Sequence, residues 1–132
     1  MEKFAFILHP LSLQDMEHLS PLMRYIPDPI IEACLKMKKP FKVSHITGIK
    51  SPYAEAEGWF IGCPLTAKQM VELPEEFVMD RIIESGKVAQ ELGAKIVGLG
   101  AFTSIVGDAG ITVAKNLDIA VTSGNSYTVA TA

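Results

Sequence analysis

The sequence predicts an α/β domain in which a mostly parallel sheet carries helices on both faces, giving a three-layer sandwich. Two observations lead to this fold class. Short apolar runs at Phe4–Leu8 and Lys95–Phe102 have the length and composition of strands buried on both faces, as in parallel sheets. A long amphipathic segment, Glu75–Leu92, directly precedes the second run, and an apolar strand at Gly58–Cys63 comes before it. Strand, helix and strand over residues 58–102 therefore predict a crossover unit.

The first third of the chain predicts one strand and two helices. The run Lys3–Leu8 is apolar and aromatic, and it stops at His9-Pro10 because proline has no backbone N–H to donate. A serine and an aspartate spaced like a capping box open a helix over residues 12–24. Asp28-Pro29 supplies an N-cap and a first-turn proline for a second helix, which ends at Lys38-Lys39-Pro40.

The middle of the chain predicts two strands and a short helix. Phe41–Thr47 alternates between apolar and polar residues, and Gly58–Cys63 is apolar and aromatic, so both segments read as strands. The loop between them is expected to run from Ser51 to Gly58. Thr66 and Gln69 form a capping box that opens the short helix.

The last part predicts a long helix, three strands and a connector. Glu75–Leu92 ends at Gly93, which suits a left-handed C-cap, and the strand Lys95–Phe102 follows. Further strands are expected at Ile111–Ala114 and Ile119–Thr122, on either side of a turn. Residues 1–122 then form one α/β domain. Residues 123–132 begin a connecting helix without a stop signal, which predicts that a second domain lies beyond this chain.

Composition and charge exclude several classes of protein. With 132 residues and 48% hydrophobic side chains, the chain is long and apolar enough for a folded core. The net charge of −3 argues against general nucleic-acid binding, and the longest apolar runs are too short to span a bilayer. No signal peptide is recognisable, so a cytoplasmic location is expected. Cys34 and Cys63 lie far apart and predict reduced thiols, and the three histidines have no metal-like spacing.

The pair Gly98 and Gly100 follows a predicted strand, as the glycines of a dinucleotide-binding loop do. The third glycine position of that motif holds Thr103, and Asp118 precedes its strand instead of following it. We therefore interpret the two glycines as positions of tight packing at the end of a strand.

Polar residues follow three of the predicted strands and mark a candidate binding site. Open parallel sheets bind ligands at the carboxyl ends of their strands. His9 comes directly after the first strand, and the segments Gly100–Ser104 and Thr122–Thr128 follow two others. Hydroxyl, amide and backbone N–H groups suit recognition of a carbonyl or carboxylate. A hydrogen-bonded histidine at a strand end explains His9 equally well, and turn formation explains residues 123–125 equally well. The predicted binding residues are His9, Phe102, Thr103, Ser104, Thr122, Gly124, Asn125 and Tyr127.

A basic segment is a second candidate for interactions. Between Arg24 and Lys50, six basic residues stand against two acids. A solvated helix end followed by an edge strand explains this, and so does a docking patch for an acidic partner. The lysines concerned are Lys36, Lys38, Lys39 and Lys42.

The segments Gly98–Val106 and Thr122–Thr128 resemble the N-terminal domain of the long-chain acyl-[acyl-carrier-protein] reductases, which make fatty aldehydes. His9 lies near the early histidine of that family. The layout is more distantly similar to the substrate domain of shikimate and quinate dehydrogenases, and thus to the N-terminal domain of the aminoacid-dehydrogenase-like fold. One departure is Tyr127, where the acyl reductases carry histidine.

The resemblance implies a function for residues 1–122. They would form the substrate-side domain of an NAD(P)-dependent reductase that converts a fatty acyl thioester to an aldehyde. NADPH or NADH and the nucleophilic cysteine would belong to the domain beyond this chain, so no catalytic residue is expected here and Cys63 is not assigned that role. An acyl carrier protein would then dock at the four lysines, and an uncovered domain interface would favour a homo-oligomer. The alternatives are a hydroxy-acid dehydrogenase of the shikimate type and a free-standing module that binds a small ligand.

Overall fold

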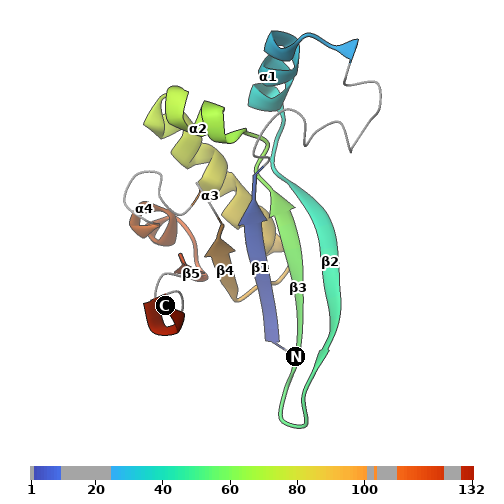
Figure 1. Ribbon diagram of the computed structural model, residues 1–132. Helices are drawn as coiled ribbons and strands as arrows, with labels where there is room; N and C mark the ends of the chain where they lie inside the picture. Colours follow the sequence, from blue (N-terminus) through green and yellow to red (C-terminus); the bar gives the residue numbers. More distant parts are fainter. Residues whose placement is uncertain (1, 10–24, 101–102, 104–109, 124–128) are drawn as a thin grey trace.

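A computed structural model describes residues 2–9, 25–100, 103, 110–123 and 129–132. Its core is a five-stranded sheet with the strand order β2-β3-β1-β4-β5 (Figure 1). The strands are β1 (Glu2–Leu8), β2 (Phe41–Lys50), β3 (Glu55–Gly62), β4 (Ile96–Leu99) and β5 (Ala120–Thr122). The helices are α1 (Asp28–Met37), α2 (Ala67–Glu72), α3 (Glu75–Glu91) and α4 (Ile111–Lys115).

The sheet is parallel except for one edge strand. The first strand, β1, lies at the centre and pairs in parallel with both β3 and β4, and β4 pairs in parallel with β5. The edge strand β2 is antiparallel to β3, and the two form a long hairpin that extends beyond the other strands (Figure 1). The predicted α/β class with a mostly parallel sheet is confirmed. The predicted crossover joins β3 to β4 through α2 and α3, and β1 lies between the two strands it connects.

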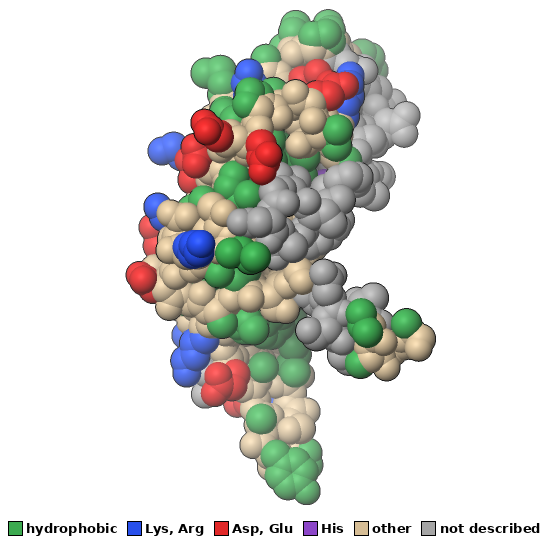
Figure 2. All heavy atoms as spheres, turned by 90° about the vertical axis from the view of Figure 1, so that its left-hand side faces the viewer, with side chains coloured by type: hydrophobic (Ala, Val, Ile, Leu, Met, Phe, Trp, Pro, Cys, Tyr) green, Lys and Arg blue, Asp and Glu red, His purple; other side chains and the backbone are tan. Residues whose placement is uncertain are grey.

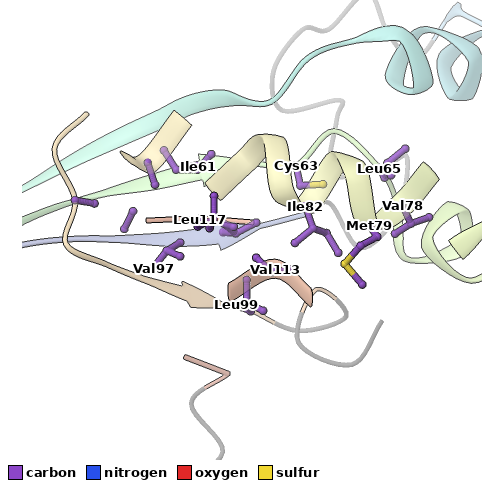
Figure 3. Close-up of a cluster of buried hydrophobic side chains, with 14 of the residues drawn as sticks. Ile61, Cys63, Leu65, Val78, Met79, Ile82, Val97, Leu99, Val113 and Leu117 are labelled. Carbon is purple, nitrogen blue, oxygen red and sulfur yellow. The ribbon is translucent and has the colours of Figure 1, made fainter. Parts of the chain in front are cut away.

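One face of the sheet carries the hydrophobic core. Ala5 and Ile7 of β1 belong to it with at most 1% of their surface exposed. Buried side chains of α3 and α4, such as Ile82 and Val113, are part of the same cluster (Figure 3). Phe6 and Leu8 alternate to the opposite face, where they are 40% and 39% exposed. The part of the chain that the structure describes places α3 and α4 on the core face. The expectation of a second helical layer stays a prediction, because the helix expected over residues 12–24 lies outside the described residues.

Local signals set the boundaries of α2 and α3. The Thr66 hydroxyl accepts a hydrogen bond from the Gln69 backbone N–H, and the Gln69 side chain accepts one from the Thr66 N–H, so the predicted capping box is present. Helix α3 begins after Pro74 and is followed by Gly93 with φ +96°, in the left-handed conformation that its position predicted. Helix α1 also forms where expected, but Asp28 is its first helical residue and not its N-cap.

The strand predicted at Ile111–Ala114 is wrong, because this segment forms helix α4. Its run of β-branched residues favours a strand locally. The chain enters α4 through Gly110, which has φ +96°, and the Gly110 carbonyl accepts a hydrogen bond from the Ala114 N–H at 2.9 Å. The turn of helix places Val113 in the core, where it is 1% exposed. Burial against the sheet outweighs the local preference.

Two further boundaries differ from the sequence prediction. The strand expected over Lys95–Phe102 ends at Leu99, and Phe102 lies outside the described residues. Gly58 was expected at the boundary between the loop and the strand Gly58–Cys63, but β3 already begins at Glu55, so Gly58 lies inside it. The Phe4 side chain occupies the space that a Cβ on Gly58 would fill, so glycine here allows an aromatic ring to lie against the strand. The actual hairpin turn covers residues 51–54, where the Ser51 hydroxyl accepts hydrogen bonds from the Tyr53 and Ala54 N–H groups.

Candidate functional site

The four parallel strands end level with one another, which creates one continuous carboxyl edge. Leu8 of β1 pairs with Gly62 of β3, and Ile7 pairs with Leu99 of β4. On the far side of β4, Gly98 pairs with Thr122 of β5. The carboxyl ends of these four strands therefore lie at the same edge of the sheet.

The order of the strands singles out one place on this edge. The chain passes from β1 to β3 on one side and later to β4 on the other side of β1. The edge between β1 and β4 is thus a topological switch point, which is where open α/β sheets bind ligands. His9 follows β1 directly and is half-buried, so it lies beside this point with part of its surface open to solvent.

The turn after β4 forms the other side of the switch point. The Gly100 N–H still donates to the Ile7 carbonyl at 3.1 Å, and the Gly100 carbonyl accepts hydrogen bonds from both the backbone N–H and the hydroxyl of Thr103, at 3.1 and 2.6 Å. Thr103 is only 1% exposed. The Thr103 hydroxyl donates its hydrogen to the Gly100 carbonyl and so stabilises the chain where it leaves β4. Thr103 therefore has a structural role here and presents almost no surface to a ligand.

The third predicted segment starts at the end of β5. Thr122 is exposed and Ser123 is half-buried, at the level of Gly98 in the neighbouring strand. The remaining predicted binding residues lie outside the part of the chain that the structure describes. They are Phe102, Ser104, Gly124, Asn125 and Tyr127.

The glycines of the Gly98-Leu99-Gly100 segment serve packing, as the sequence predicted. A Cβ on Gly98 would lie 2.7 Å from the Phe6 ring, and a Cβ on Gly100 would lie 2.8 Å from the Ile7 carbonyl oxygen. The close approach is to a neighbouring strand of the same sheet. These glycines thus allow β1 and β4 to pack together, which accounts for them without a bound nucleotide.

Cys63 also follows a parallel strand at this edge, but it points into the core (Figure 3). Its side chain has no exposed surface, and burial raises the pKa of the thiol to about 11. The thiol is therefore protonated and covered at neutral pH, which supports the prediction that Cys63 is not a nucleophile. Cys34 is exposed, and both cysteines are free thiols.

We expect this buried thiol to make the fold less stable in alkali. An unfolded chain releases the Cys63 proton near the ordinary pKa of 9.0, whereas the folded chain holds it until about 11. As pH rises from about 9 to 11, the free energy of unfolding should fall by about 2 to 3 kcal/mol through this group. Urea denaturation across this range should show that Cys63→Ala loses this part of the pH dependence. Cys34→Ala should keep it, and identical slopes for all three proteins would contradict the assignment.

A group of charged side chains at the other end of the strands was not predicted. Glu57 Oε2 lies 3.0 Å from His45 Nε2, and Glu57 Oε1 lies 3.5 Å from Lys3 Nζ. The His45 ring stacks on Trp59 with 5.2 Å between the ring centroids. The hydrogen bond from His45, with a smaller contribution from Lys3, holds the pKa of Glu57 below its usual value. The pairing registers of β1 and β2 with β3 bring these residues together, so residue types alone gave no signal of the cluster.

Among the described residues, no group of three or more His, Cys, Asp or Glu side chains has an arrangement that could hold a metal ion. None of the described helices has the length and apolar character that crossing a membrane requires.

Comparison with known proteins shows a similarity to part of a longer protein. No protein-family model matches the chain. The chain is 38% identical over 87 residues to the protein named aminotransferase PigE from Serratia sp. (strain ATCC 39006). The matched residues make up 66% of this chain and 10% of that relative, so the chain spans about a tenth of the length of the relative. The chain is thus similar to a small part of a much longer protein that is named as an enzyme.

Proposed function

We propose that this chain is the substrate-binding domain of a larger NAD(P)-dependent reductase that converts a fatty acyl thioester to an aldehyde. The carboxyl edge between β1 and β4 is the observation that carries the proposal. At this topological switch point His9 follows β1, and Gly100, which is hydrogen-bonded to Thr103, follows β4; β5 ends on the far side of β4. In this role the domain positions the thioester carbonyl, and a second domain supplies the nicotinamide nucleotide.

The packing of two glycines supports the assignment of substrate and nucleotide to different domains. Gly98 and Gly100 are used for contacts between β1 and β4, so a nucleotide-binding loop is expected elsewhere. Cys63 is buried and protonated, so it is unsuited to act as a nucleophile, which agrees with a nucleophile supplied by another domain. The similarity to a small part of a long enzyme agrees with a domain that acts within a larger protein.

The codons that follow Ala132 provide the first test. A strand, a glycine-rich loop and a helix encoded within about 30 residues would support a reductase, because this arrangement binds dinucleotides. A stop codon directly after Ala132 would instead favour a free-standing module that binds a small ligand. In that case, ligand screening by thermal shift on the chain itself would replace the enzyme assay.

The decisive assay uses the complete protein that the gene encodes. It is mixed with NADPH or NADH and either an acyl thioester or a hydroxy acid, and nicotinamide absorbance is followed. Oxidation of the nucleotide with the thioester, together with aldehyde formation, supports the proposal. Nucleotide reduction with the hydroxy acid alone favours the shikimate type of dehydrogenase, and no change with either substrate contradicts both.

We expect His9→Ala to lower kcat/KM for the thioester roughly tenfold or more, as loss of a substrate contact of about 1.4 kcal/mol does. Nucleotide affinity should not change, because the nucleotide binds to the other domain. His45→Ala is the matched control, since His45 is a partly exposed histidine in the middle of the edge strand β2, away from the carboxyl edge. Equal losses in the two variants would remove His9 from the site.

The named relative suggests a second candidate function. That relative is an aminotransferase, and an aldehyde is a carbonyl compound that can accept an amino group. A protein containing this chain would then reduce a thioester and pass the aldehyde to transamination, which adds an amino donor to the assay. Amine formation in the complete protein would support this version, whereas accumulation of free aldehyde in the presence of amino donors would support the reductase alone.

A further inference from the structure

Helix α1 has apolar residues on two faces, and only one of these faces is buried in the fold. The inner face contributes Ile31 and Leu35, which are 4% and 3% exposed. The outer face, which we call the outer stripe, consists of Ile30, Ala33, Cys34 and Met37, all of them exposed. Ile30 is 53% and Met37 82% exposed. Hydrophobic side chains accordingly form the top of the molecule in Figure 2, at the height of α1 in Figure 1.

A helix that is apolar on both sides is normally covered on both sides. The residues of the outer stripe are three, four and seven positions apart, so they form a continuous row along the helix. Tyr25 and Ile26, which are 78% and 38% exposed, lie just before α1 and add apolar surface at its start. This is the arrangement by which one helix packs along another.

A cluster of lysines lies at the far end of the outer stripe. We call it the basic corner, and it comprises Lys36, Lys38, Lys39 and Lys42, all exposed. Lys36 Nζ lies 5.6 Å from the Phe77 ring centroid and Lys38 Nζ lies 4.4 Å from that of Phe41. Within the described part of the chain, none of the four ammonium groups is within ion-pair distance of a carboxylate, whereas nearby Glu32 is paired with Lys68 at 3.8 Å.

We propose that the outer stripe and the basic corner form a docking surface for an acidic amphipathic helix of another protein. The apolar face of that helix would cover Ile30, Ala33, Cys34 and Met37, and its carboxylates would pair with the basic corner. The inference depends on the surface of α1 and not on the reductase chemistry. An acidic carrier protein that delivers a thioester would be one partner with such a helix.

A second copy of the chain fits this surface less well. The described acidic helix is α3, with Glu75, Glu76 and Asp80 near its start. Its apolar residues Val78 and Ile82 have no exposed surface because they fill the core of their own domain. Helix α3 therefore has no free apolar stripe to pack against α1.

An anionic membrane fits less well for a different reason. Helices that lie on membranes carry basic residues along the polar side of an apolar face. Here Lys36 lies in the last turn of α1, and Lys38, Lys39 and Lys42 follow the last residue of the outer stripe, so the lysines gather at one end of the stripe. Charge at one end of an apolar row suits a protein helix with a local acidic cluster.

The test uses two synthetic helical peptides of about 18 residues, a length that allows helix formation. Both carry the same leucine stripe, and the remaining positions are mainly Glu and Asp in one peptide and mainly Lys in the other. Fluorescence anisotropy with the 132-residue chain should show binding of the acidic peptide and little binding of the basic one. Affinity should fall as salt is raised, because the pairing is electrostatic.

Variants on each part of the surface complete the test. Lys38→Glu/Lys39→Glu/Lys42→Glu and, separately, Ile30→Gln/Met37→Gln should each weaken binding of the acidic peptide roughly tenfold. Lys50→Glu/Val71→Gln is the matched control, since both residues are exposed and lie outside this surface. Circular dichroism checks that every variant is folded, and the lysine variant tests the proposal even if the apolar one fails to fold.

Four results would overturn the proposal. They are no binding of the acidic peptide, equal binding of both peptides, binding of phosphatidylserine vesicles without binding of the peptide, and gel-filtration dimers that Ile30→Gln/Met37→Gln converts to monomers. The last two would assign the surface to a membrane and to a second copy, respectively.

Discussion

Ile82→Ala should lower the free energy of unfolding by about 4 kcal/mol, because it removes a fully buried branched side chain from a close-packed site. Ile82 lies on α3 and has no exposed surface, and it is surrounded by side chains from the strands and from α3 itself (Figure 3). Helix α3 is the longest described helix and covers the core face of the sheet, so little around the deleted atoms can collapse to fill the space.

A loss of this size is a large part of the total stability of a domain, which is about 5 to 15 kcal/mol. Urea denaturation followed by circular dichroism measures it. Val71→Ala is the matched control, since Val71 lies on α2 and is 70% exposed, and it should change stability by less than about 0.5 kcal/mol. A loss below about 1.5 kcal/mol for Ile82→Ala would show that α3 is not packed on the sheet as described.

Elements with strong local signals could be predicted from the sequence. The capping box at Thr66 and Gln69 opens α2, and Gly93 takes the left-handed conformation after α3, because both signals act through hydrogen bonds and backbone geometry within a few residues. The ends of the apolar runs at Leu8 and Gly62 also lie close to where the sequence predicted them. These parts of the fold depend on short stretches of chain.

Elements that depend on distant contacts could not be predicted in the same way. The β-branched residues at the start of α4 favour a strand, but burial of Val113 against the sheet determines the outcome. At the candidate site, the sequence places Thr103 at the edge without showing that its hydroxyl turns inward to Gly100. The outer stripe of α1 has the same origin, because only the fold shows which apolar residues of this helix are covered.

The second large effect concerns the junction of β1 and β4, where we expect Gly100→Ala to cost about 2 to 3 kcal/mol. A Cβ on Gly100 would lie 2.8 Å from the Ile7 carbonyl oxygen, which is backbone and cannot swing away. The same oxygen accepts the hydrogen bond from the Gly100 N–H, so separating the strands to relieve the clash also lengthens that bond.

Gly98→Ala is the matched control, two residues earlier in the same segment. Its Cβ would lie 2.7 Å from the Phe6 ring, but that residue is 40% exposed and its ring can rotate outward, so the cost should stay below about 1 kcal/mol. Thermal and urea denaturation of the two variants measure the difference, and equal costs would contradict this packing. Because the Gly100 carbonyl also anchors Thr103, Gly100→Ala should displace the turn beside His9 as well. In the complete protein, this variant is therefore expected to impair substrate use more than Gly98→Ala, which links the packing of the central strands to the geometry of the proposed binding edge.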